Sequence, residues 1–145
     1  MSLFSVLSVS ASGMAAQRTR AELLVQNIAN SETTRTAEGG PYRRKDAIFS
    51  TEHVSSAFAS EFDAQLNGSE TGVKVSGISV DNTEPERRYM PGHPDADADG
   101  YVAMPRVNPA EDMVDLMGAS RSYQANVSAM SAIKDMIQHS IDLLK

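Results

Sequence analysis

Apolar residues recur every seven positions near the amino-terminal end of the chain. The repeat runs through Leu7, Met14, Ala21 and Ile28, and no proline precedes Pro41. A stripe at this spacing is typical of an amphipathic helix, so the pattern predicts one helix from residue 2 to about residue 30. Gly13 lies inside that helix and weakens it by about 1 kcal/mol relative to alanine.

A longer repeat occupies the carboxyl-terminal end. Asn108 suits a helix N-cap, Pro109 suits the first helical position, and no proline follows. Heptads sustained over about four repeats indicate a coiled-coil seam, in which a polar residue such as Asn126 sets register or partner choice. The main row is Leu116, Tyr123, Met130, Ile137 and Leu144, and the expected second row is Met113, Val127 and Ile141, joined by Ala119 and Ile133.

The length of the second helix bears on the architecture. About 35 helical residues span ~52 Å, whereas a compact domain of this size has a diameter near 40 Å, estimated from its radius of gyration. We therefore expect an α+β, mainly α fold in which the two terminal helices pair as an antiparallel coiled coil. Residues 1–30 and 108–145 would form this domain, and residues 31–107 a small β-rich lobe inserted between the helices.

The middle of the chain contains short strand patterns between turn residues. Candidate strands run from 42 to 49, 73 to 80, 87 to 90 and 101 to 104. Apolar residues spaced by four favour a short helix between the first two strands; they are Val54, Phe58, Phe62 and Leu66.

One motif resembles the start of a calcium-binding loop. Asp95, Asp97, Asp99 and Gly100 match its first half, but the twelfth position, which needs a bidentate glutamate, is Arg106. We interpret the segment as an aspartate-rich turn with Gly100 at positive φ. His53, His93 and His139 show no metal-ligand spacing, and no nucleophile motif or phosphate-binding glycine loop occurs in the sequence. We therefore expect no catalytic site, no cofactor and no metal.

Two clusters of charged residues are explained by local structure. Arg43, Arg44 and Lys45 are typical of a solvated strand edge, and Glu111 with Asp112 fits the first turn of a helix, where the macrodipole favours acids. Two long helices with apolar rows on several faces cannot bury all of them against each other. Large apolar surfaces mark interaction sites, so we expect the chain to pack with copies of itself or with relatives.

Composition excludes several classes of function. The chain has 145 residues, 13 Lys and Arg, 19 Asp and Glu, and a net charge of −6, which argues against nucleic-acid binding. It contains no cysteine, so it has no disulfides or thiolate metal ligands. No apolar run is long enough to cross a bilayer, so we expect no membrane insertion. The serine-rich start superficially resembles a secretory signal, but we interpret it as the first turns of the helix.

Several strings, taken in order along the chain, resemble the bacterial flagellar rod and hook axial proteins, and within that family its proximal rod members. The amino-terminal string is 26–33, with the signature at Asn27, Ile28, Ala29 and Asn30. The carboxyl-terminal strings are 111–117 and 119–126, with Arg121, Tyr123, Gln124 and Asn126. The middle strings are 40–45, 72–75, 89–94 and 100–105.

This resemblance implies a structural subunit of the rod of the flagellar basal body, which crosses the periplasm and transmits torque for motility. Implied partners are copies of the chain, other rod and rod-adaptor proteins, and the flagellar export apparatus, through which members pass without a cleaved signal. An alternative from another class is a helical adaptor or weak calcium-binding interaction protein. The candidate assembly residues are Leu7, Met14, Asn27, Ile28, Asn30, Leu116, Arg121, Tyr123, Gln124, Asn126, Met130, Ile137 and Leu144.

Overall fold

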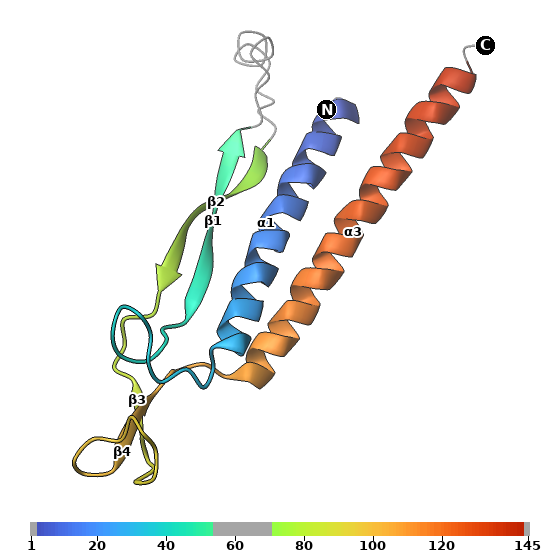
Figure 1. Ribbon diagram of the computed structural model, residues 1–145. Coiled ribbons are helices and arrows are strands. Elements are labelled where there is room, and N and C mark those ends of the chain that lie inside the picture. Colours follow the sequence, from blue (N-terminus) through green and yellow to red (C-terminus); the bar gives the residue numbers. More distant parts are fainter. Residues whose placement is uncertain (1–2, 54–70, 144–145) are drawn as a thin grey trace.

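The computed structural model describes residues 3–53 and 71–143, and two long antiparallel helices dominate it (Figure 1). Helix α1 spans Leu3–Ala29 and helix α3 spans Pro109–Asp142. The two helices pack along their length, and both termini lie at the same end of the molecule. The predicted mainly helical fold with an antiparallel terminal pair is confirmed.

The start of α3 follows the capping chemistry predicted for it. The side chain of Asn108 accepts a hydrogen bond from the backbone N–H of Ala110, and Pro109 occupies the first turn. The Asn108 side chain thereby satisfies one of the backbone donors that a helix leaves unpaired at its start. The cap therefore fixes where the irregular chain ends and the helix begins.

The seam between the helices differs from the predicted one in its second row. Met113, Val127 and Ile141 are 54%, 45% and 47% exposed, so their assignment to the seam was wrong. Alternating steps of four and three from the buried Asp112 instead reach the half-buried or buried positions Leu116, Ala119, Asn126, Met130, Ile133 and Ile137. Tyr123, which was predicted for the main row, lies on the same steps but is 41% exposed, whereas the predicted Ala119 and Ile133 are buried. The error arose because apolarity was used as the guide, whereas this seam includes an aspartate and an asparagine.

Strands β1 (Lys45–His53) and β2 (Thr71–Val80) form an antiparallel pair that packs along α1. Figure 1 shows α1 between this hairpin and α3. The register runs from Lys45 opposite Val80 to His53 opposite Thr71, with an irregularity between Ile48 and Phe49. Successive side chains of a strand point to opposite faces, and one face of this hairpin supplies Ala47 and Phe49 to a cleft shared with α1.

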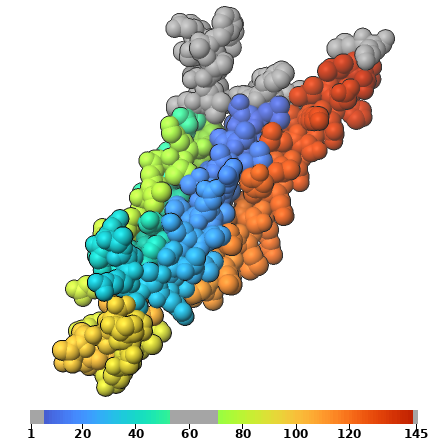
Figure 2. Space-filling model, viewed as in Figure 1, coloured from blue at the N-terminus to red at the C-terminus, as the bar shows by residue number. Residues whose placement is uncertain are grey.

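Strands β3 (Glu86–Tyr89) and β4 (Tyr101–Met104) form a second antiparallel pair beyond the end of the helices. The rings of Tyr89 and Tyr101 meet edge to face with centroids 5.3 Å apart. Val102 on the other face is 1% exposed. Figure 2 shows the result, an elongated body with this hairpin at one tip.

The four predicted strands are all found; β4 has the predicted bounds, and the bounds of β1, β2 and β3 are shifted. The expected helix through Val54, Phe58, Phe62 and Leu66 lies outside the described residues. The division into a helical domain of residues 1–30 and 108–145 and a separate lobe of residues 31–107 stays a prediction. None of the described helices is both long enough and apolar enough to span a membrane.

Candidate assembly surfaces and the buried junction

The predicted assembly residues on the helix pair fall into two groups. Most of the apolar ones are half-buried in the monomer: Leu7, Met14, Ile28, Leu116, Met130 and Ile137. Arg121 and Gln124 are exposed, and Tyr123 is 41% exposed. Leu144 lies outside the described residues. The first group is therefore partly covered within the monomer, and the second is accessible at the surface.

A shallow groove of about 530 Å³ runs between the helices at their middle. Leu116 and Tyr123 line it from α3, where they bracket the buried Ala119, and Gln17 and Ala21 line it from α1. The groove thus brings two predicted assembly residues together on one surface.

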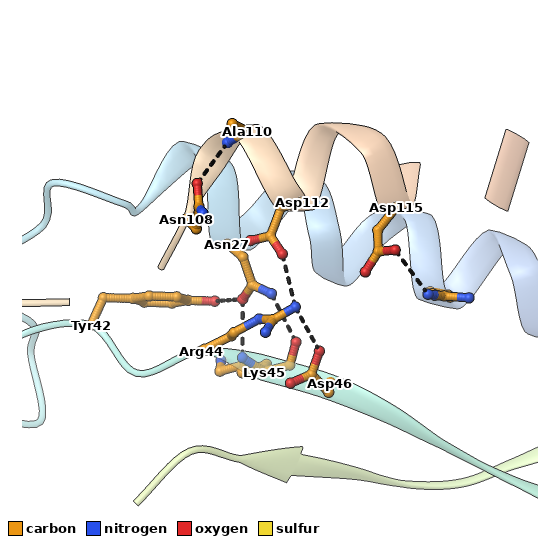
Figure 3. A network of polar contacts seen from close by, with 10 residues as sticks. Asn27, Tyr42, Arg44, Lys45, Asp46, Asn108, Ala110, Asp112 and Asp115 are labelled. Atoms are coloured by element: carbon orange, nitrogen blue, oxygen red, sulfur yellow. Dashed lines mark hydrogen bonds and ion pairs between the residues drawn. The ribbon is translucent and has the colours of Figure 1, made fainter. Parts of the chain in front are cut away.

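Asn27 is the most completely enclosed of the predicted assembly residues (Figure 3). It is fully buried, and its side-chain amide makes hydrogen bonds to both backbone groups of Lys45. Nδ2 donates to the carbonyl at 2.9 Å, and Oδ1 accepts from the N–H at 3.0 Å. The hydroxyl of Tyr42 also donates to Oδ1, at 2.9 Å. Asn27 therefore takes the place of a neighbouring strand at the start of β1.

Arg44 and Asp112 form the other half of this buried junction, which we define as Asn27, Tyr42, Arg44, Lys45 and Asp112. Arg44 Nη2 donates to Asp112 Oδ1 at 2.9 Å, and the Asp112 side chain is 0% exposed. Arg44 also lies 3.5 Å from Asp46. The junction therefore ties together the last turns of α1, the start of β1 and the first turn of α3, as Figure 3 shows.

The junction perturbs two titratable groups. Burial raises the pKa of the Asp112 carboxyl even though the Arg44 guanidinium acts to lower it. The second oxygen of Asp112 is buried, and no described residue donates a hydrogen bond to it. Burial also raises the pKa of the Tyr42 phenol, and the negative charges of Asp112 and Asp46 add to that effect. A charged Asp112 is thus held at a cost in solvation.

Sequence reasoning missed Tyr42, Arg44 and Asp112 as junction residues. The interpretation of Arg44 as part of a solvated strand edge was wrong, because it pairs with a buried carboxylate. The macrodipole explanation of Asp112 was incomplete, because that residue faces the protein interior. An aspartate at a seam position in a helix's first turn was the one available signal.

Asn30 and Asn126 make local contacts instead. The Asn30 side chain donates to the Gln26 carbonyl at 2.8 Å and accepts from the Thr33 hydroxyl at 3.2 Å, which closes the end of α1. The Asn126 side chain donates to the Ser122 carbonyl at 3.0 Å. Asn30 therefore closes the end of α1, and Asn126 bonds within α3 while its side chain faces Gly13 of α1.

The aspartate-rich segment folds as a turn. Asp97 Oδ1 accepts from the backbone N–H groups of Asp99 and Tyr101, Asp97 Oδ2 pairs with Arg87, and Gly100 adopts a φ of 80°. The hydrogen bonds to Asp97 hold the pKa of its carboxyl below the usual range. Among the described residues no cluster of three or more candidate ligands could hold a metal ion.

Apolar side chains remain uncovered along α3. Eight of them on this helix and its end are at least 41% exposed: Met113, Val114, Met117, Tyr123, Val127, Met136, Ile141 and Leu143. Single exposed apolar residues are ordinary, and the number of them on this one helix motivates the proposal made below.

Comparison with known proteins relates this chain to flagellar rod proteins. A family model described as the flagellar basal body rod FlgEFG protein C-terminal region matches residues 98–143. Flagellar basal-body rod protein FlgC of Bacillus subtilis is 42% identical over 152 aligned positions, which cover 100% of both chains. The chain belongs to the FlgC family of flagellar basal-body rod proteins.

Other relatives agree over the whole length. FlgC of Borreliella burgdorferi is 39% identical and covers 100% of this chain and 99% of its own. FlgC of Salmonella typhimurium is 35% identical, and the alignment covers 99% of this chain and 98% of that relative. Membership of the FlgC family makes the chain a structural rod protein, and the match to residues 98–143 coincides with β4 and α3.

Proposed function

We propose that this chain is a subunit of the proximal part of the rod, where it packs with copies of itself and with other rod and rod-adaptor proteins. Its role is mechanical: interlocked helices transmit torque, and no step requires catalysis. The proposal also includes export through the flagellar export apparatus without a cleaved signal, and a final position in the part of the basal body that crosses the periplasm.

The observation that carries this proposal is the unpartnered apolar surface of α3. Met117, Val127 and Met136 are each at least 45% exposed on a helix of 34 residues. Each fully buried side chain of this size contributes roughly 1.5–3 kcal/mol, so covering such a surface by neighbouring subunits supplies a large driving force for assembly.

A truncation tests the proposal. A chain that ends after Asp135 loses the last turns of α3, including Met136 and Ile141, and we expect it to be absent from purified basal bodies and to abolish motility. A chain shortened only by Lys145 is the matched control and should assemble. Normal basal bodies and motile cells with the first truncation would contradict the proposal.

A further inference from the structure

Helix α1 caps the outer edges of the β1–β2 hairpin at two places. Asn27 binds the backbone N–H and carbonyl of Lys45 on β1, and the Ser12 hydroxyl accepts from the backbone N–H of Val73 on β2 at 3.1 Å. Figure 1 shows why two different strands are capped: the hairpin crosses α1 obliquely, so that β1 is next to the helix at one end and β2 at the other.

The same hydrogen bonds show which other backbone N–H and carbonyl groups of the two strands point outward. In an antiparallel pair, opposed residues alternate between those that bond to each other and those whose backbone groups turn outward. The backbone groups of Lys45 bind Asn27, so its partner Val80 also turns outward. Two positions along, Ala47 and Ile78 are opposed and turn outward as well.

Residues 75–80 of β2 therefore form an edge that α1 does not cap. Ile78 and Val80 on this edge are 52% and 41% exposed. The segment contains no lysine, no other charge and no proline, and these are among the devices that protect a strand edge from pairing with another chain. The register irregularity of the hairpin falls at Ser76, so residues 77–80 are the regular part of this edge. An apolar, unprotected edge of this kind is a template for strand addition.

The second half of β1 is the reciprocal edge. Val73 turns its N–H toward Ser12, so its partner Thr51 turns outward, and Phe49, two residues away on the same strand, does the same. Phe49 is 38% exposed. The hairpin thus carries two uncapped half-edges at its opposite ends. They are residues 75–80 of β2 and residues 49–52 of β1.

We propose that these half-edges pair between copies of this chain, with residues 75–80 of β2 in one copy joined to residues 49–52 of β1 in the next. The contact is heterologous, because different surfaces meet, and such contacts extend into open arrays instead of closing as dimers. This inference rests on the proposed function and specifies one of its subunit contacts.

Disulfide trapping tests the pairing, since the chain has no cysteine of its own. The principal variant is Ser79→Cys with Ser50→Cys in one chain. Within a copy, Ser79 lies opposite Asp46 and Ser50 opposite Lys74, so the two sites are roughly 15 Å apart along the hairpin, estimated from the rise per residue. A disulfide needs Cα atoms within about 7 Å, so any bond formed must join two copies.

Oxidised basal bodies containing this variant should give a ladder of products longer than a dimer. The pairs Ser79→Cys with Ile48→Cys and Ser79→Cys with Glu52→Cys scan the neighbouring registers, and Ser79→Cys with Ser128→Cys on exposed α3 is the control that should stay unlinked. The inference is overturned if all three pairs stay unlinked in assembled rods, form dimers only, or link to a different rod protein.

A charge on the edge gives a second test that is independent of register. We expect Ile78→Lys to lose incorporation into basal bodies, whereas Ile48→Lys, at a similarly exposed residue on the other face of the hairpin, should retain it. Equal incorporation of the two variants would overturn the strand pairing and leave the proposed rod function intact. Absence of the unaltered chain from basal bodies would instead overturn the proposed function.

Discussion

Gly13 of α1 faces Asn126 of α3 so closely that a Cβ added to Gly13 would lie 3.2 Å from Asn126 Nδ2. This close approach explains a glycine in the middle of a 27-residue helix. Gly118 of α3 shows the opposite situation, because a Cβ added there would meet nothing within 4 Å. The two glycines therefore allow helix propensity to be separated from packing.

We expect Gly118→Ala to stabilise the isolated chain by about 1 kcal/mol, the ordinary helix-propensity difference. Gly13→Ala should give no such gain, because Asn126 must shift to admit the new methyl group. Urea denaturation of the two variants and the parent measures both effects. Equal stabilisation by the two substitutions would show that the helices are not in close contact at Gly13.

Removing the Asn27 side chain should destabilise the chain strongly. Asn27→Ala leaves the buried N–H and carbonyl of Lys45 without their partner, and each unsatisfied group costs about 1–3 kcal/mol. We therefore expect a loss of about 3 kcal/mol in the free energy of unfolding. Gln26→Ala at the exposed neighbouring position is the control and should change stability by less than about 0.5 kcal/mol. A loss in Asn27→Ala no larger than that in Gln26→Ala would contradict the role of Asn27 as the partner of the Lys45 backbone.

Arg44 and its neighbour Arg43 provide a matched pair of charge removals. Arg44→Met leaves the buried carboxylate of Asp112 unpaired, which should cost about 3 kcal/mol. Arg43 is exposed and binds Asn82 Oδ1 at 2.7 Å, so Arg43→Met should cost at most about 1 kcal/mol. Thermal or urea unfolding of the two variants compares these costs. If Arg43→Met proved the more damaging substitution, the account of the buried junction would be wrong.

Acid should reveal the raised pKa of Asp112. The folded state binds a proton at Asp112 more tightly than the unfolded chain, so this group contributes stability below about pH 3.9 that is lost as pH rises through its folded pKa. The lowered pKa values of Asp81 and Asp97 have the opposite effect, since their stabilisation is present above about pH 3.9 and lost below it.

Asp112→Asn removes the contribution of Asp112 to the pH dependence of stability and leaves those of Asp81 and Asp97. We therefore expect the stability of the parent relative to this variant to increase as pH falls from 7 toward 4, measured by urea unfolding at each pH. A difference that stays constant over this range would show that Asp112 titrates at its ordinary pKa in the folded chain.

The helices and strands could be predicted from the sequence because their signals are local. Asn108 and Pro109 mark the start of α3 by backbone chemistry alone. Leu116 and Met130 of the predicted sevenfold row are half-buried, but Tyr123 between them is 41% exposed. The four strands could be predicted because turn residues precede and follow each of them.

The buried junction could not be predicted, because its residues come from three distant parts of the chain. Nothing near Asn27 indicates that its amide will meet Lys45, and nothing near Arg44 indicates a carboxylate 68 residues away. The same limitation explains the wrong second row of the seam, since Asp112 is polar and only its long-range partner accounts for its burial. Whether the predicted assembly residues contact other subunits stays a prediction.

The most direct measurement is a cryo-electron microscopy map of the basal body from cells in which this chain is the only FlgC-family protein. The account predicts rod density near the base that fits the antiparallel pair of α1 and α3, with copies packed along the exposed apolar surface of α3. A complete rod from cells that lack the chain, or a map in which that surface of α3 faces solvent throughout, would contradict it.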